Sequence, residues 1–289
     1  MILRTNADKL PVLSVQGTIH HPQCLGYLVD PRGGAHVLPQ IGGITYNVGL
    51  GDSVYGWAGD HVEPGVSLSN DRADDNRALN ILSCVGNDAL VMSGKAKGNK
   101  GTVIGKHLSV ELKSSHVLLD FDQDVLELLD VDDTILIKAC GQGLELTDFP
   151  AITISHLDPR TLSRMELEKD GDQLLVPVTA KVPAQLLGFK TGMDTYRGDF
   201  DLVTDDMALL QSHNLLSLKI GDLILIEDYD CSYSPGYRRG ARTIGLIVTG
   251  DAVPAGQGPG ILSLMSSQTG QIVGRIDKTS SLNKYLDRI

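Results

Sequence analysis

Histidine and carboxylate side chains suited to chemistry occur together in one short segment. This segment runs from Trp57 to Gly65 and contains Asp60, His61 and Glu63. In an extended chain, His61 and Glu63 share one face because successive side chains alternate. An imidazole beside carboxylates suits a divalent-metal site or an acid/base pair, while a surface turn with solvated side chains is the alternative. We expect the carboxylates to orient the His61 ring, in a loop away from the core.

Two further histidines, His107 and His116, flank the next strand region nine residues apart. Folding could bring both of them beside His61. Imidazole and carboxylate groups are common ligands of divalent ions. We therefore assign four candidate ligands for one divalent metal ion of unspecified identity, with Glu63 as a catalytic residue: the ligands are Asp60, His61, His107 and His116.

A second group of polar residues lies at the ends of two apolar β-branched runs, 218–230 and 239–251. Gly221-Asp222 ahead of the first run fits a tight turn in which the carboxylate bonds nearby backbone N–H groups. That turn leaves the carboxylates of residues 227–230 unexplained. We predict that the run ends supply a second wall of the site, with four further candidate catalytic residues: Asp228, Asp230, Tyr237 and Arg239.

These candidates predict a hydrolase-like protein acting on a small amide or related molecule. A divalent metal would polarise the carbonyl and lower the pKa of a bound water, so that no activated serine or cysteine is needed. The sequence contains no Gly-x-Ser-x-Gly elbow, no Walker loop, no Rossmann fingerprint and no His-Glu-x-x-His motif. Their absence argues against nucleotide-dependent and serine-triad chemistry.

A lysine-rich segment supports the alternative, a non-catalytic binding protein for RNA or another polyanion. Residues 85–107 read as strand, Gly/Lys turn and strand, and residues 93–103 resemble the short KOW motif of ribosome-associated barrels. The lysines of this hairpin are Lys95, Lys97, Lys100 and Lys106. The formal net charge of −11 disfavours nucleic acid as a partner, because such affinity comes largely from neutralising phosphates.

Composition predicts the elements that must position these residues. With 289 residues, 32 glycines and 12 prolines, the chain fits two mainly β domains, sandwich- or barrel-like, with a few short helices. We place the boundary at 148–150, giving domains 1–149 and 150–289. Helices are expected at 122–129, 158–165 and 205–213. Residues 129–138 and 218–227 run parallel position by position, which suggests an element shared by both domains.

The sequence also carries expectations about the compartment and the assembly of the protein. The four cysteines are widely spaced and form no Cys-x-x-Cys pair. No apolar run approaches the roughly 20 residues needed to cross a bilayer, and the first residues do not read as a signal peptide. We expect a cytoplasmic protein with no membrane partner. A Gly-rich β protein with exposed strand edges also favours a homo-oligomer.

Several long motifs, in order, resemble an uncharacterised prokaryotic family catalogued as domain of unknown function 4438. They are residues 57–66 (WAGDHVEPGV), 94–101 (GKAKGNKG), 105–107 (GKH), 138–144 (KACGQGL) and 255–260 (AGQGPG). This resemblance implies an N-terminal and a C-terminal domain and assigns no reaction.

The C-terminal half in turn resembles the acetamidase/formamidase family. The residues that carry this resemblance are 220–228 (IGDLILIED), 236–237 (GY), 241–248 (ARTIGLIV) and 256–260 (GQGPG). It implies a β-sandwich core and raises metal-assisted amide hydrolysis as the reaction. The chain departs from the pattern at Gln257, where the last Gly-rich loop usually carries His. Glutamine cannot act as a general base and is a poor metal ligand.

Overall fold

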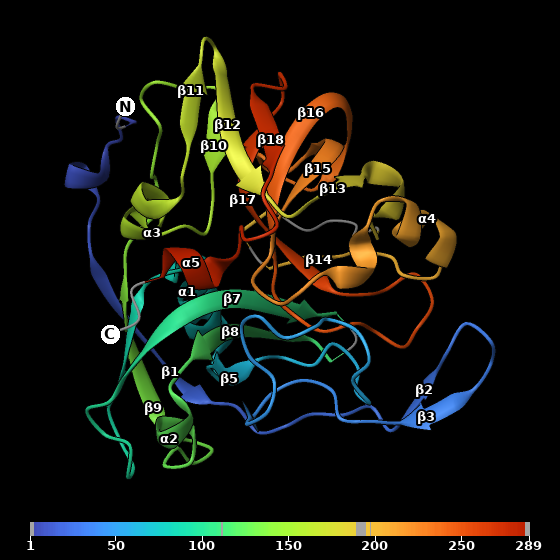
Figure 1. Ribbon diagram of the computed structural model, residues 1–289. Coiled ribbons are helices and arrows are strands. Elements are labelled where there is room, and N and C mark those ends of the chain that lie inside the picture. The colour runs from blue at the N-terminus through green and yellow to red at the C-terminus, as the bar shows by residue number, and fades with distance from the viewer. Residues whose placement is uncertain (1–2, 111, 189–194, 197, 287–289) are drawn as a thin grey trace.

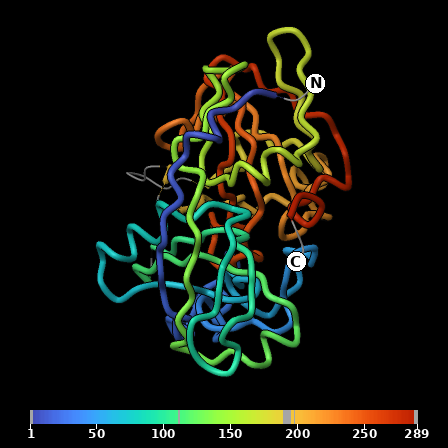
Figure 2. The backbone as a smooth tube through the Cα atoms, turned by 90° about the vertical axis from the view of Figure 1, so that its left-hand side faces the viewer, coloured from blue at the N-terminus to red at the C-terminus, as the bar shows by residue number. Residues whose placement is uncertain are grey.

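The computed structural model describes residues 3–110, 112–188, 195–196 and 198–286. The protein is mainly β with a few short helices, which confirms the predicted fold class. Figure 1 shows the N-terminal half below and the C-terminal half above. The first described residues pack on the core of the C-terminal half before the chain descends into the N-terminal sheet (Figure 2).

The N-terminal half is built on an antiparallel barrel. In its sheet the strand order is β1-β9-β6-β7-β8-β5-β4, and β1 also pairs with β5, so the sheet closes on itself. Closure leaves few open edges for aggregation. The strands are β1 (Leu13–Ile19), β4 (Ile44–Thr45), β5 (Gly65–Ser69), β6 (Asp88–Val91), β7 (Lys100–Ser109), β8 (Ser114–Asp120) and β9 (Thr134–Ala139). A separate hairpin contains β2 (Tyr27–Val29) and β3 (Ala35–Val37).

Alternating apolar residues fill the barrel. On β9, Ile135, Ile137 and Ala139 are buried while the residues between them are not, as expected of a strand with one face inward. They meet Leu68 and Leu119 from β5 and β8 in one core cluster. Burying each such aliphatic side chain contributes about 1.5–3 kcal/mol.

The C-terminal half is a sandwich of two sheets. The larger has the order β10-β17-β16-β15-β13, with β14 also paired to β17, and the smaller has the order β11-β12-β18. Its strands are β10 (Ile152–Ile154), β11 (Glu168–Asp170), β12 (Gln173–Val178), β13 (Ala180–Pro183), β14 (Phe200–Asp201), β15 (Leu223–Asp230), β16 (Gly236–Ile247), β17 (Gly260–Ser267) and β18 (Ile272–Ile276).

The unbroken apolar run of β15 follows from its central position. Leu223 and Leu225 enter the core shared with the smaller sheet, and Ile224 and Ile226 enter the core on the other face. A strand buried on both faces does not alternate polar and apolar residues.

The helices are short. Three lie inside the predicted segments: α2 (Gln123–Leu126), α3 (Pro159–Arg164) and α4 (Met207–Ser212). The Asp158 side chain caps α3 by accepting from the Arg160 N–H. The longest helix, α1 (Ala73–Leu82), was not predicted. The remaining helical elements are α5 (Leu282–Tyr285) and the 3₁₀ turns η1 (Ala7–Lys9), η2 (Ala184–Leu186) and η3 (Leu215–Ser217).

The two parallel sequence segments form the same turn. Asp133 Oδ2 accepts from the Asp130 N–H at 2.9 Å, and Asp222 Oδ2 accepts from the Lys219 N–H at 3.0 Å. Each turn leads into a strand, β9 and β15 respectively. The repetition therefore reflects one Asp-closed turn used at the start of a strand in both halves.

The halves meet across β7. A Cβ added at Gly105 would lie 2.7 Å from a Val248 side-chain carbon, so only glycine lets the strand approach the C-terminal half this closely. Ile104 and Leu118 share a core cluster with Leu246 and Val248. The predicted boundary at 148–150 lies in the link between β9 and β10.

Candidate functional site

Glu63 is the centre of a buried polar cluster in the N-terminal half. Its Oε1 accepts from His107 Nδ1 at 2.7 Å, and its Oε2 accepts from His116 Nδ1 at 2.9 Å and from the Gly42 N–H at 2.7 Å. The Ser67 hydroxyl also donates to Oε2. Burial alone would raise the pKa of Glu63, but the bonds and positive charge of the two imidazoles hold it well below its usual range. The carboxylate therefore stays ionised.

The barrel's register places the two imidazoles together. His107 on β7 and His116 on β8 are direct cross-strand partners. Opposite residues of an antiparallel pair project to the same face about 5 Å apart. Glu63 reaches both rings from the segment that precedes β5.

Ser114 extends this cluster to the surface of the barrel. It lies two residues before His116 on β8, and its Oγ is 2.9 Å from His116 Nε2. With its Nδ1–H donated to Glu63, the neutral form of His116 has its lone pair on Nε2, where it can accept the Ser114 proton. Serine, histidine and glutamate thus stand in the order that activates a nucleophilic serine.

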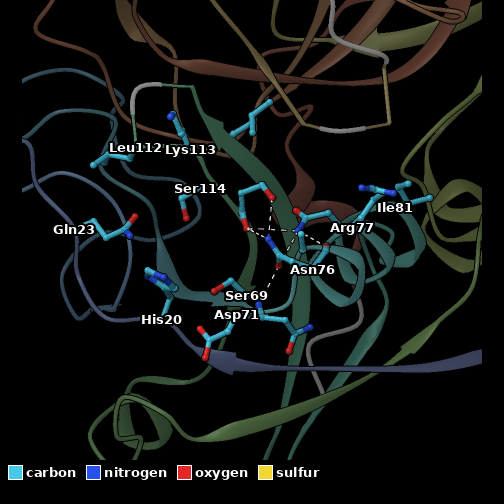
Figure 3. Close-up of a pocket in the computed structure, with 15 residues that line it drawn as sticks. His20, Gln23, Ser69, Asp71, Asn76, Arg77, Ile81, Leu112, Lys113 and Ser114 are labelled. Atoms are coloured by element: carbon cyan, nitrogen blue, oxygen red, sulfur yellow. Dashed lines mark hydrogen bonds between the residues drawn. The ribbon is translucent and has the colours of Figure 1, made fainter.

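Ser114 and His20 line one cavity of about 470 Å³ (Figure 3). The His20 ring packs on the His116 ring with centroids 4.8 Å apart, and its Nδ1 lies 2.6 Å from the His21 carbonyl. Burial and the neighbouring His116 charge lower the pKa of His20. Asn76 and Arg77 from α1 face the cavity from the opposite wall, and Lys113 lies at its rim.

Two buried amide oxygens in the cavity wall have no hydrogen-bond donor among the described residues: Gln23 Oε1 and Asn80 Oδ1. Asn80 Nδ2 donates to the Asn76 carbonyl at 2.9 Å, which turns Oδ1 away from that bond. An unpaired buried acceptor costs about 1–3 kcal/mol.

His61 belongs to the cluster but not in the predicted way. It does lie in a loop, as predicted, but it is buried with 8% of its surface exposed, so its placement away from the core was wrong. Its φ of 49° also excludes the extended chain that would align it with Glu63. Its ring stacks on His107 at 5.3 Å between centroids.

Two carboxylates flank the His61 ring. Asp60 Oδ2 is 3.8 Å from Nδ1, and Asp201 Oδ1 is 3.7 Å from Nε2. Burial would lower the pKa of His61, but these two carboxylates raise it to about 10. His61 is therefore a buried imidazolium at neutral pH, and Asp60 is further fixed by the Val253 N–H and the Gln40 side chain.

The candidate metal ligands are not arranged as a metal site. Over the described ranges, no group of three or more His, Cys, Asp or Glu residues could hold a metal ion. His116 uses both ring nitrogens, for Glu63 and for Ser114. The four proposed ligands do share one cluster, and a metal there stays a prediction.

The proposed second wall is a separate group on β15 and β16. Asp228 Oδ1 accepts from the Gly240 N–H at 2.7 Å. Asp230 accepts from Ser232 and Gln268, and these bonds lower its pKa against the opposing effect of burial. The side chains of Tyr237 and Arg239 are exposed. The bonds described for both aspartates therefore stay within this region rather than reaching Glu63.

The lysine hairpin is only partly available to a polyanion. Lys106 is fully buried, and its Nζ lies 2.7 Å from His156 Nδ1. Burial lowers the pKa of Lys106 to about 8. Lys95 pairs with Asp130 at 3.7 Å. The Lys95, Lys97 and Lys100 side chains are exposed, and binding of RNA to them stays an untested prediction.

Sequence reasoning missed Ser114, His20 and Asp201. Ser114-Ser115-His116 has the spacing of two that places Ser114 and His116 on one face of a strand, and Asp199-Phe200-Asp201 repeats it. This alternation was the available signal. The absence of a serine elbow motif had argued against a serine triad, yet such triads are recognised by geometry.

Comparison with known proteins identifies the family. The N-terminal model of the domain of unknown function DUF4438 matches residues 27–163, and the C-terminal model matches residues 164–286. A solved structure described as "Crystal structure of TM1086" is 40% identical, with a TM-score of 0.93, and the match covers 99% of this chain and 100% of that chain. The search of curated proteins gave no match. Among the described residues no helix is long and apolar enough to span a membrane. The chain therefore belongs to the DUF4438 family, as its motifs had suggested.

Proposed function

We propose that the protein hydrolyses small amides or related acyl compounds, with Ser114 as nucleophile, His116 as general base and Glu63 as the group that orients His116. The observation that carries this proposal is the pair of bonds at His116, 2.9 Å to Ser114 Oγ and 2.9 Å to Glu63 Oε2. A buried carboxylate on Nδ1 selects the tautomer that can accept a proton at Nε2.

The reaction would proceed in two steps. Ser114 Oγ attacks the carbonyl carbon and its proton passes to His116 Nε2, while ionised Glu63 stabilises the imidazolium. The carbon–nitrogen bond breaks as His116 returns the proton to the leaving nitrogen, which leaves an acyl group on Ser114. Water then attacks this ester with His116 again as base, and the carboxylic acid is released.

The cavity's unpaired acceptors favour an amide. Gln23 Oε1 and Asn80 Oδ1 both lack a donor among the described residues, and turning of these side chains toward the cavity would offer two acceptors to the two N–H groups of a small primary amide. The volume of about 470 Å³ fits a small molecule. The acetamidase/formamidase-like motifs of the C-terminal half support the same substrate class. No step of this mechanism is assigned to a metal ion.

Reaction with a fluorophosphonate tests the nucleophile. The reagent forms a bond between Ser114 Oγ and phosphorus with loss of fluoride, and intact-mass spectrometry measures the adduct. We expect one adduct on the wild-type protein and none on Ser114→Ala. Ser115→Ala is the matched control, because Ser115 is the adjacent residue and its hydroxyl is bonded to Asn76 instead of His116.

Hydrolysis of short primary amides and of their esters gives the second readout. We expect turnover by the wild type and by Ser115→Ala, and a large loss in Ser114→Ala. Equal labelling of Ser114→Ala and wild type, with folding of both checked by circular dichroism, would overturn the assignment of the nucleophile.

A further inference from the structure

The hairpin of β2 and β3 is isolated from the other sheets. Its strands pair only with each other over the described chain, and Figure 1 shows the hairpin projecting from the body at the lower right. Its register pairs Tyr27 with Val37 and Val29 with Ala35. These residues therefore share one face of the hairpin, which we call the arm face.

The arm face is apolar and exposed. Tyr27, Val37 and Val29 are 77%, 64% and 56% exposed, whereas Leu28 on the opposite face is buried. His36 on that opposite face is fixed by Asp30, with Nε2 2.8 Å from Oδ2. An isolated two-stranded hairpin is marginally stable in water. Covering the arm face would remove this apolar surface from solvent and stabilise the hairpin.

An apolar groove adjoins the arm face. It has a volume of about 740 Å³, and its lining includes Val37, Pro39, Ile44, Tyr46 and Trp57. Val37 belongs to both surfaces, so the arm face and the groove form one continuous apolar patch. A contiguous patch of this kind is typical of an interaction surface.

We propose that a second copy of this chain covers the patch, with each arm face packed in the partner's groove about a two-fold axis. The arm face and the groove are both apolar, and a two-fold axis uses both surfaces twice. Charge does not prevent a second copy from binding at this patch. Two chains that each carry a formal net charge of −11 repel each other. Residues 21–50, which supply most of the patch, contain one aspartate, one arginine and no glutamate or lysine. The patch is where two copies meet with little repulsion.

Light scattering of the intact protein tests the assembly. We expect twice the chain mass of 31.0 kDa at about 100 μM, far above the micromolar Kd of a modest interface. Val37→Asp should give the single-chain mass with an unchanged circular dichroism spectrum. Ile276→Asp is the matched control, since Ile276 is similarly exposed but lies on β18, and it should remain a dimer.

The exposed Cys24 thiol provides a readout that needs no charge substitution. Cys24 lines the groove, whereas Cys84 and Cys231 are buried. In a dimer, its rate of reaction with excess Ellman's reagent should fall as protein concentration rises, and Cys24→Ser identifies the signal. A single-chain mass with a concentration-independent rate would overturn the proposal. A dimer that persists in a folded Val37→Asp variant would overturn it equally.

Discussion

Ser114 and His116 lie on the same face of β8, with the serine hydroxyl 2.9 Å from the imidazole Nε2. The alternation of a strand suffices to bring them together. The barrel then adds the third residue, because β5 pairs with β8 and the segment before β5 presents Glu63 to His116. The proposed triad therefore depends on one strand for its reacting pair and on barrel closure for its orientation.

Replacing Glu63 with glutamine should separate catalysis from binding. The amide cannot stabilise an imidazolium, and its N–H₂ group opposes the His116 N–H, so His116 would turn to the wrong tautomer. We expect turnover to fall about 10⁴-fold, as in triads whose acid is neutralised, with a much smaller change in KM. Steady-state kinetics on a primary amide measures both constants.

His107→Gln is the control for that substitution. His107 also donates to Glu63, at 2.7 Å, but Ser114 is bonded to His116 instead. Its replacement perturbs the same buried carboxylate and should cost stability without a comparable loss of turnover. Equal losses of turnover in the two variants would contradict the assigned order of the triad.

Local chemistry was predictable from sequence, and long-range register was not. The Gly221-Asp222 turn and the three short helices follow from capping and turn preferences within a few residues. The candidate residues His107 and His116 do converge on Glu63, but their convergence depends on pairing between β7 and β8 and on the bulge near Gly105. A spacing of nine residues does not specify such a register.

The predicted second wall shows a related limit of sequence patterns, and its role in a site stays a prediction. A carboxylate-rich strand end looks the same in sequence whether its side chains face a site or its own hairpin. Here the bulge between Glu227 and Tyr229 places Asp228 at φ 56°, where its side chain closes on the Gly240 N–H. The local backbone, which the sequence pattern does not reveal, decides the partner.

Gln23→Met should weaken the preference for amides while leaving the fold intact. The substitution removes an acceptor that has no donor among the described residues and keeps a similar side-chain volume, so the melting temperature should be unchanged or higher. Loss of one hydrogen bond of about 1 kcal/mol lowers kcat/KM for the amide about fivefold. The matching ester lacks that N–H and should be little affected. An unchanged amide-to-ester ratio would count against Gln23 as a substrate contact.

Gly105→Ala should destabilise the contact between the halves. The added Cβ would lie 2.7 Å from one Val248 side-chain carbon and 3.0 Å from another. Overpacking of this kind costs about 1–3 kcal/mol. Gly49→Ala is the matched control, since no atom lies within 4 Å of its added Cβ and its φ is not positive. Urea denaturation should lower the midpoint of the first variant only; equal midpoints would show that β7 can move away from Val248.

His61 should make stability depend on pH. Its pKa in the folded protein is about 10, above the ordinary 6.5, so folding favours the protonated ring. The stabilisation is complete below pH 6.5 and is lost as pH rises through about 10. At 1.4 kcal/mol for each pKa unit, it is on the order of 4 kcal/mol at neutral pH. His61→Gln removes it and leaves Asp60 and Asp201 without their shared cation.

The difference in unfolding free energy between wild type and His61→Gln isolates this contribution. Buried Lys106 acts in the opposite direction, since its pKa of about 8 lies below the ordinary 10.5 and its protonated form is destabilising. Lys106 is present in both proteins and cancels in the difference. Urea titrations from pH 6 to pH 10 should therefore show a difference that is largest at the acid end and shrinks toward the alkaline end. A difference that does not vary with pH would show that His61 is not a buried imidazolium between Asp60 and Asp201.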